Sequence, residues 1–330
     1  MKRIFYLFLL TLAVLAGCKK SSFESVFEKS PEERVADAIS NVSTALTSSP
    51  NGWVVTLPTF AGGGYGFYMS FDADQNVLMY SDISDAAAST SATSTYRVTT
   101  GLGAMLAFDT YNFISVLQDP KAAVYGGVQG KGFSSDVEFT FERSNADSLF
   151  FIGRQFRQPL VMVKATAAQK TAYAAAGLKA SMDKIKSFLT TVKNPYIEVV
   201  SGSTTLKVGL TLNTTNVMSS GKRADLTGVL ADGKTVSSSG QKFAFTADGV
   251  DLLSGGLVWQ GITFVRIRWK DATTLALYDS TGKEYIVKAS PTPLVPLFQL
   301  WGSKYNGMLS EYKTIYPGTS ASGTTILNYF

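Results

Sequence analysis

Apolar and polar residues follow two different periods along the chain. Between residues 31 and 47, apolar side chains recur at spacings of three and four, which is the period of an amphipathic α-helix. Ser30 can cap this helix, Pro31 suits its first turn, and Glu33 can complete a capping box. From Trp53 onwards, apolar residues alternate with polar ones, which is the period of a β-strand. The pattern therefore predicts one amphipathic helix that precedes a β-rich body.

Short alternating segments, separated by turn residues, predict many antiparallel strands on both sides of a second helical segment. Before that segment we expect strands at residues 53–57, 65–71, 77–80, 96–99, 104–108, 137–141 and 149–152. After it we expect strands at residues 198–200, 205–212, 243–246, 250–253, 263–269, 274–278 and 285–289. The helical segment spans Thr166 to Val192, and Gly177 leaves open whether it forms one helix or two. Residues 84–95 are predicted to form a long loop, whereas residues 110–117 fit either a helical turn or a strand.

The start of the chain has the layout of a secretory signal peptide. A short basic segment, residues 1–3, is followed by an apolar run over residues 4–15, which is shorter than the ~20 residues of a transmembrane helix. The sole cysteine then ends the sequence Leu15-Ala16-Gly17-Cys18, which closely resembles a bacterial lipobox. We therefore expect the Cys18 thiol to carry a diacylglycerol and acyl chains such as palmitate, which would anchor the mature chain in a membrane. The alternatives are an ordinary signal peptide cleaved elsewhere and a short membrane anchor.

The residues after the cysteine bear on the choice of membrane. Lys19 and Lys20 stand there instead of an aspartate. By resemblance to lipoprotein sorting rules, this disfavours retention in the inner membrane, so we expect an outer-membrane lipoprotein. Glu24 is the first acidic residue after Cys18, which leaves open whether the chain lies on the periplasmic face or on the cell surface.

The order of elements predicts a mostly β fold with two antiparallel lobes, each barrel-like or sandwich-like. The chain exceeds the ~250–300 residues at which a single hydrophobic core stops growing, which favours two lobes. We divide it into a signal peptide, a tether, an N-terminal helix with a β lobe, a helical connector and a C-terminal β lobe. Their bounds are 1–17, 18–29, 30–164, 165–194 and 195–330.

Composition narrows the possible chemistry. The 330 residues include no histidine and one cysteine, which excludes imidazole acid–base catalysis, histidine-based triads, internal disulfides and cysteine-cluster metal sites. The 30 basic and 25 acidic residues are nearly balanced, and no dense basic stripe is visible. We therefore expect no cofactor, no metal ion and no nucleic-acid partner.

Several short segments are similar to a known family. They are Ser30-Pro31-Glu32-Glu33-Arg34, Asn51-Gly52-Trp53-Val54, Gly63-Gly64-Tyr65-Gly66-Phe67-Tyr68-Met69-Ser70-Phe71-Asp72, Phe108-Asp109-Thr110-Tyr111-Asn112, Asp119-Pro120 and Asp136-Val137-Glu138-Phe139. Together with the lipobox, they resemble an uncharacterised lipoprotein family of Bacteroidota, domain of unknown function 4302, over residues 30–160. The resemblance implies a companion of TonB-dependent outer-membrane uptake systems. It implies no functional residue, because the family has no established activity or site.

Two motifs have part of the spacing of ligand-binding loops, but both lack required residues. Asp72-x-Asp74-x-Asn76 matches the opening of a calcium loop, yet Val77 and Ile83 stand where such a loop needs Gly and Glu. We therefore predict a solvated hairpin turn at this motif. The glycine-rich segment 126–132 lacks the residues of a phosphate loop, and we predict a flexible turn there.

Paired carboxylates are the only catalytic chemistry that the composition leaves open. Asp136 and Glu138 are predicted to lie on one face of a strand about 7 Å apart, within the range for two working acids, and Glu142 extends the row. Outward-facing polar residues of an ordinary half-buried strand produce the same pattern, so we expect no catalytic residue. Residues 266–270 also place two arginines and a lysine on one face, which a solvated strand edge explains equally well.

Aromatic residues make up 12% of the chain and are candidates for ligand contact. Tyrosine and tryptophan rings on loops stack well on sugar rings and apolar ligands. The candidate binding residues are Trp53, Tyr65, Tyr68, Trp259, Trp301 and Tyr305. For each of them, the alternative is a place in the hydrophobic core.

These observations favour a non-enzymatic binding or accessory protein of a nutrient-uptake system, anchored to the outer membrane. The expected partners are the membrane, a glycan or peptide ligand, and a TonB-dependent uptake complex. One alternative is a structural or adhesion protein that binds another protein through an exposed sheet edge or aromatic patch. A less favoured alternative is a carboxylate-based glycoside hydrolase.

Overall fold

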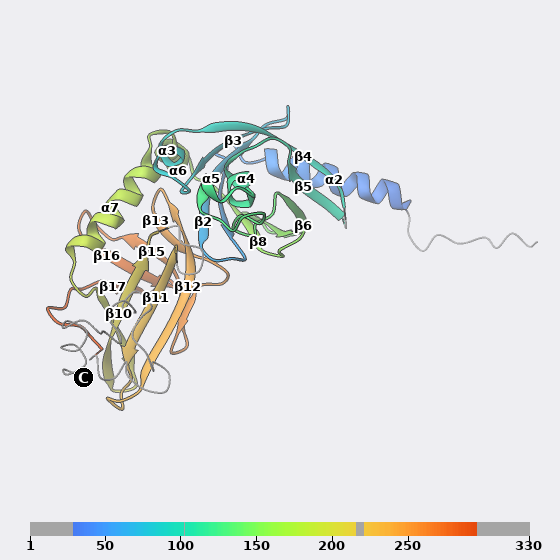
Figure 1. Cartoon of the computed structure of the whole chain (residues 1–330). Helices are drawn as coiled ribbons and strands as arrows, with labels where there is room; N and C mark the ends of the chain where they lie inside the picture. The colour runs from blue at the N-terminus through green and yellow to red at the C-terminus, as the bar shows by residue number, and fades with distance from the viewer. Residues whose placement is uncertain (1–28, 102, 216–220, 296–330) are drawn as a thin grey trace, which may run out of the picture.

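The computed structural model describes residues 29–101, 103–215 and 221–295. Within these ranges the chain is mostly β, with two antiparallel sheets that follow one another along the sequence (Figure 1). This confirms the predicted fold class. The predicted signal peptide, most of the predicted tether with Cys18, and the end of the predicted C-terminal lobe lie outside the described residues. None of the described helices has the length and apolar character needed to cross a membrane.

The first sheet closes on itself and is called the first barrel below. Its strands are β1 (Trp53–Pro58), β2 (Gly64–Phe71), β3 (Asn76–Ser81), β4 (Ala92–Gly101), β5 (Gly103–Phe108), β6 (Glu138–Ser144), β7 (Ser148–Gly153) and β8 (Pro159–Lys164). Each strand pairs antiparallel with the next, and β1 pairs with β8, which closes the ring. Inward-facing side chains such as Val55, Phe67 and Met69 are fully buried. A barrel of eight strands has room for such side chains and little else, so its interior is a packed core.

The helix α2 (Pro31–Thr47) is the predicted amphipathic helix, and it begins with the predicted capping box. The Ser30 hydroxyl accepts a hydrogen bond from the Glu33 N–H, and the Glu33 carboxylate accepts one from the Ser30 N–H. Val42 and Leu46 are buried against the first barrel, and the indole N–H of Trp53 donates to the Leu46 carbonyl at 2.8 Å. The first half of the helix is exposed and projects from the body (Figure 1).

Two connections of the first barrel contain helices. The prediction of a loop over residues 84–95 is wrong, because α3 (Asp85–Ser89) and the start of β4 lie there. Ser84 caps α3 by accepting from the Ala87 N–H, and the small Ala87 and Ala88 allow the short helix to pack closely. The connection after β5 contains α4 (Phe113–Gln118) and α5 (Ala122–Tyr125). Of the two structures considered for residues 110–117, the helical turn is the one observed.

A pair of helices connects the two sheets. These are α6 (Ala167–Ala174) and α7 (Gly177–Thr191), which settles the choice between one helix and two. Ala176, between them, has a φ of 57°, in the left-handed region. A Cβ atom on Gly177 would approach the Ala172 carbonyl oxygen to 2.6 Å, so glycine is needed where the second helix begins.

The second sheet contains the remaining strands. They are β9 (Tyr196–Ser201), β10 (Thr204–Asn213), β11 (Arg223–Val229), β12 (Val236–Thr246), β13 (Gly249–Leu252), β14 (Leu257–Trp259), β15 (Ile262–Trp269), β16 (Leu275–Asp279) and β17 (Glu284–Ile286). The long strand β12 pairs with β11 along its first part and with β13 along its end. Tyr196 and Lys288 exchange backbone hydrogen bonds of 2.9 and 2.7 Å, which bring the first and last strands together. The second lobe is therefore barrel-like as well.

The two lobes touch where β2 crosses β12. A Cβ atom on Gly64 would lie 2.5 Å from the Phe243 carbonyl oxygen, and one on Gly66 would overlap the Phe245 carbonyl. Glycine at these two positions of β2 therefore lets the backbones of the two sheets approach each other directly.

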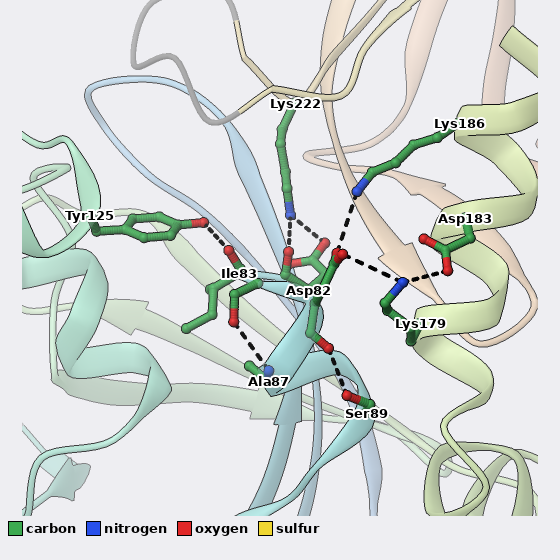
Figure 2. A network of polar contacts seen from close by, with 11 residues as sticks. Asp82, Ile83, Ala87, Ser89, Tyr125, Lys179, Asp183, Lys186 and Lys222 are labelled. Carbon is green, nitrogen blue, oxygen red and sulfur yellow. Dashed lines mark hydrogen bonds and ion pairs between the residues drawn. The ribbon is translucent and has the colours of Figure 1, made fainter. Parts of the chain in front are cut away.

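A buried ion pair lies at the same junction. The Lys222 ammonium is 2.6 Å from the Asp82 carboxylate, and both side chains are almost fully buried. The same carboxylate accepts backbone hydrogen bonds from Gly66 of the first barrel at 2.9 Å and from Phe245 of the second sheet at 2.8 Å. Figure 2 shows Lys222 reaching Asp82, with Tyr125 on one side and the lysines of α7 on the other. Asp82 thus connects both lobes through one side chain.

Candidate functional site

The connections of the first barrel decide where a ligand can reach it. Because successive strands run in opposite directions, the connections β1–β2, β3–β4, β5–β6 and β7–β8 all emerge at one end. The longest of these carries α4 and α5 across the mouth of the barrel. There Tyr125 and Phe133 pack on Tyr65, with ring centroids 6.1 and 6.0 Å away. The mouth is therefore covered, and a ligand can meet only the outer surface of this end.

That surface contains a groove of about 500 Å³, called the end groove below. The residues from the β5–β6 connection that line it include Asp109, Tyr111, Gln118 and Asp119, and the β7–β8 connection contributes Gln155 and Phe156. A smaller hollow of about 300 Å³ adjoins it and shares Gln118, Val137 and Gln155. The groove thus combines aromatic rings with carboxylates and amides. Binding sites for ligands that have both polar groups and an apolar face contain the same mixture.

Tyr111 is the most exposed aromatic side chain of the end groove, with 63% of its surface accessible. Its hydroxyl donates to Asp119 at 2.6 Å, and Asp119 also accepts from the Lys121 N–H at 2.9 Å. The hydrogen bond from Tyr111 lowers the pKa of Asp119, helped by the one from Lys121. Partial burial and the bond to Asp119 raise the pKa of Tyr111 to about 12. Asp119 therefore fixes the direction of a ring whose face remains open to solvent.

A second aromatic surface lies on the β7–β8 side. Phe156 lines the groove and stacks against Phe60 of the β1–β2 connection, with centroids 6.2 Å apart and planes at 30°. Phe60 is 67% exposed. Phe60 and the half-buried Phe156 thus form a small apolar surface beside the groove, available for contact with a ligand or partner.

Asp136 holds the β7–β8 connection in place. Its side chain is buried and accepts hydrogen bonds from the Gln155 N–H at 2.7 Å and the Phe156 N–H at 3.0 Å. A Cβ atom on Gly153 would collide with this carboxylate, so glycine is required beside it. Asp136 is thus a positioning residue for two groove residues.

The carboxylate pair predicted from the sequence is engaged in structural contacts. Asp136 precedes β6 instead of lying within it, and Glu138, the first residue of β6, forms an ion pair with Arg154 at 2.5 Å. Glu142 lies farther along β6 and lines a different cleft. Asp136 and Glu138 therefore adjoin the end groove, but each already has hydrogen-bonding partners of the protein.

The six aromatic candidates lie elsewhere. Trp53 and Tyr65 are buried in the core of the first barrel, Trp259 in that of the second sheet, and Tyr68 packs on Tyr173 of α6 with centroids 4.9 Å apart. These four residues are at most 3% exposed and serve as core side chains. Trp301 and Tyr305 lie outside the described residues.

The exposed Tyr111 and the half-buried Phe156 of the groove were not among those candidates. Tyr111 lies in one of the segments that carry the family resemblance. It was not identified as a candidate because it belongs to a connection, where the alternation of apolar and polar residues does not show which rings face solvent. Asp72 accepts from the backbone and side-chain N–H groups of Asn76, which forms the predicted hairpin turn between β2 and β3. Across the three described ranges, no group of three or more acidic or cysteine side chains is placed to hold a metal ion.

The search of curated proteins finds no match to the chain. The family model described as Domain of unknown function (DUF4302) matches residues 23–271, which include α2, the whole first barrel and the second sheet as far as β15. This match covers well over half of the sequence and includes every residue of the end groove. The chain therefore belongs to the family of Domain of unknown function (DUF4302).

Proposed function

We propose that this protein is an outer-membrane lipoprotein that binds a glycan or peptide in the end groove, as a non-enzymatic component of a nutrient-uptake system. The observation that supports it most is the exposed ring of Tyr111, oriented by Asp119 within a groove that also presents Gln118 and Gln155. A ring of this kind stacks on the apolar face of a sugar or on a peptide side chain, while amides and carboxylates bond to hydroxyl or N–H groups.

The place of the groove agrees with an anchor at Cys18. The tether enters α2, and α2 leads into the start of β1, whereas the groove lies at the end where β1 finishes. A lipid-anchored chain of this shape presents the groove at the end of the first barrel opposite to the entry of α2. This arrangement leaves the groove free to capture a ligand.

The stacked pair of the exposed Phe60 and the half-buried Phe156 favours a second candidate, the structural or adhesion role in which this end of the barrel binds another protein. Crosslinking on intact cells distinguishes the two. A stoichiometric protein partner, found without binding of any small ligand, would favour this second function.

Equilibrium binding to a panel of oligosaccharides and peptides tests the first proposal. We expect Tyr111→Ala to weaken the binding of any active ligand by about tenfold, because the stacking surface is lost, while Tyr111→Phe keeps most of the affinity. Tyr278→Phe is the matched control, because Tyr278 also donates its hydroxyl to a carboxylate, that of Glu284, but on the second sheet. No binding across the panel, or equal affinity for the wild type and Tyr111→Ala, would reject the end groove as the site.

A further inference from the structure

A second and larger cleft lies between the two lobes, and the end groove does not include it. Its volume is about 630 Å³, and it is called the inter-lobe cleft below. One wall is the outer face of β1, β7 and β8, and the other is formed by β13, β15 and the connection after β13. Clefts between domains are frequent binding sites, because both lobes can contribute side chains to one ligand.

The strands β6 and β15 each contain a β-bulge at residues that line the cleft. The pairing of β6 with β7 shifts between Phe141 and Arg143, and the pairing of β15 with β16 shifts between Phe264 and Arg266. In a regular strand, consecutive side chains point to opposite faces. Here the consecutive residues 142 and 143 both line the cleft, as do 265 and 266. Each bulge therefore turns an arginine into the cleft, and bulges commonly redirect side chains beside binding sites.

These two arginines differ in their partners from four other arginines of the chain. Arg97, Arg154 and Arg223 form ion pairs with carboxylates, and Arg268, at the edge of the cleft, pairs with Asp251. Within the described residues, no ion pair is formed by Arg143 or Arg266. Their guanidinium groups are instead placed over rings, that of Arg143 3.6 Å from the centroid of Phe150 and that of Arg266 5.6 Å from the centroid of Tyr278. A guanidinium stacked in this way keeps its N–H edge available for a planar oxyanion.

The charge balance of the cleft favours an anion. Asp251 is occupied by Arg268, and Lys164 donates to the Ala146 carbonyl at 2.7 Å while keeping its charge. Apart from the Asp251–Arg268 pair, the charged residues that line the cleft are three cations, Arg143, Lys164 and Arg266, and one anion, Glu142. The excess is positive.

The floor of the cleft is apolar. Val161 and Val163 of β8 point outward from the first barrel, where Val163 remains 44% exposed, and Phe150 lies beside them on β7. An inorganic ion would leave this surface uncovered. A ligand that has a carbon body as well as a negatively charged group would contact both the apolar floor and the cationic side chains.

We propose that the inter-lobe cleft binds an organic carboxylate, with its oxyanion held by the guanidinium groups of Arg143 and Arg266 and its carbon body lying on the valines of β8. This is a second site, independent of the ligand in the end groove. Phosphate shares the oxyanion chemistry but lacks the carbon body, so it serves as a comparison.

Calorimetric titration of the full mature chain with benzoate, benzamide and inorganic phosphate tests this proposal. Benzoate should bind at least about tenfold more tightly than the neutral benzamide and than phosphate, and its affinity should fall with added salt. Benzoate that does not bind, or that binds no better than either comparison compound, would overturn the proposal.

Variants localise the site. Arg143→Gln and Arg266→Gln should each weaken benzoate binding by about tenfold, and Arg266→Lys, which keeps the charge but loses the planar fork, should weaken it less. Arg223→Gln, the same charge change on β11 outside the cleft, is the matched control and should bind benzoate as the wild type does. Tyr111→Ala should also leave benzoate binding unchanged, which separates this site from the end groove. An equal loss in Arg223→Gln and Arg266→Gln would show a general effect of charge and would overturn the assignment.

Discussion

At the scale of single residues, the junction of the lobes depends on Asp82 and Lys222. Burial raises the pKa of the Asp82 carboxyl and lowers that of the Lys222 ammonium, because each charged form loses water, and each group partly offsets this for the other. The carboxylate also accepts one backbone N–H from each lobe. Buried pairs of this kind are costly to form and more costly to break, because an isolated buried charge has nothing to replace water.

We predict that Lys222→Met lowers the free energy of unfolding by about 3–5 kcal/mol, because the Asp82 carboxylate is left buried without its cation. Urea denaturation followed by circular dichroism measures this. Lys270→Met is the control, because Lys270 forms an exposed ion pair with Glu284, and such pairs contribute little. A loss in Lys222→Met no larger than that in the control would show that the pair does not stabilise the junction.

The hydrogen bond between Tyr111 and Asp119 gives a second prediction at this scale. A carboxyl whose pKa is lowered by folding contributes stability above its ordinary pKa, and that contribution disappears as the pH falls through its folded-state pKa. Tyr111→Phe removes the largest cause of the shift, so the pKa of Asp119 should rise toward its ordinary value. Carboxyl-carbon NMR titration measures it, with Tyr278→Phe as the control. An Asp119 pKa that stays unchanged in Tyr111→Phe would contradict the proposed contact.

The sequence was less informative about individual side chains than about strands. Trp53 and Tyr65 belong to alternating strands, and alternation shows that one face is buried without showing that a particular ring lies inside a closed barrel. Tyr111 and Phe156 belong to connections, where no period applies. The arginines of the inter-lobe cleft point into it because of two β-bulges. A bulge alters the backbone without requiring a particular residue type, so the pattern of apolar and polar residues does not show where it lies.

At the scale of elements, local rules predicted the helices that start with a clear cap. Ser30 with Glu33 forms the capping box expected from the sequence, and Thr166 with Gln169 forms a second one at the start of α6. The strand β8 was missed because apolar residues occupy both of its faces. Leu160 and Met162 point into the barrel, while Val161 and Val163 line the cleft, so no alternation of polar and apolar residues marks it. The contacts between the two lobes join residues that are distant in sequence, so the sequence pattern did not predict them.

The close approach of β2 to β12 depends on two glycines of β2, Gly64 and Gly66, which place no side chain at the crossing. We predict that Gly66→Ala destabilises the fold by about 1–3 kcal/mol, because the new methyl group would overlap the Phe245 carbonyl and force the lobes apart. Thermal unfolding measures the change. Gly101→Ala is the control, because a Cβ atom there would meet only the flexible Met105 side chain, at 3.3 Å. Equal melting temperatures for Gly66→Ala and the wild type would contradict direct contact between the two backbones.

At the scale of the whole molecule, two β lobes follow a proposed membrane anchor. The fold class and the presence of a helical connector followed from the order of periods along the sequence. Closure of the first barrel did not, because the partner of β1 is β8, more than a hundred residues later. The proposed anchor rests on the signal-peptide layout and the lipobox, and it can be tested apart from the fold.

We predict that Cys18→Ala abolishes incorporation of labelled palmitate and releases the protein from the membrane fraction, because the acyl chains supply the membrane affinity. Metabolic labelling followed by fractionation measures both. The double-lysine variant Lys19→Ala/Lys20→Ala is the control for changes near the cleavage site and should keep the label. Palmitate in Cys18→Ala, or its absence in the wild type, would refute the lipid anchor.

The central claim is that the outer surface at the covered end of the first barrel holds the ligand. Hydrogen exchange measured by mass spectrometry, with and without the tightest glycan or peptide of the panel, tests it most directly. We predict that protection on binding is concentrated in residues 108–120 and 153–157, the two connections that line the end groove. Protection confined to the second sheet, or to the inter-lobe cleft, would contradict the account.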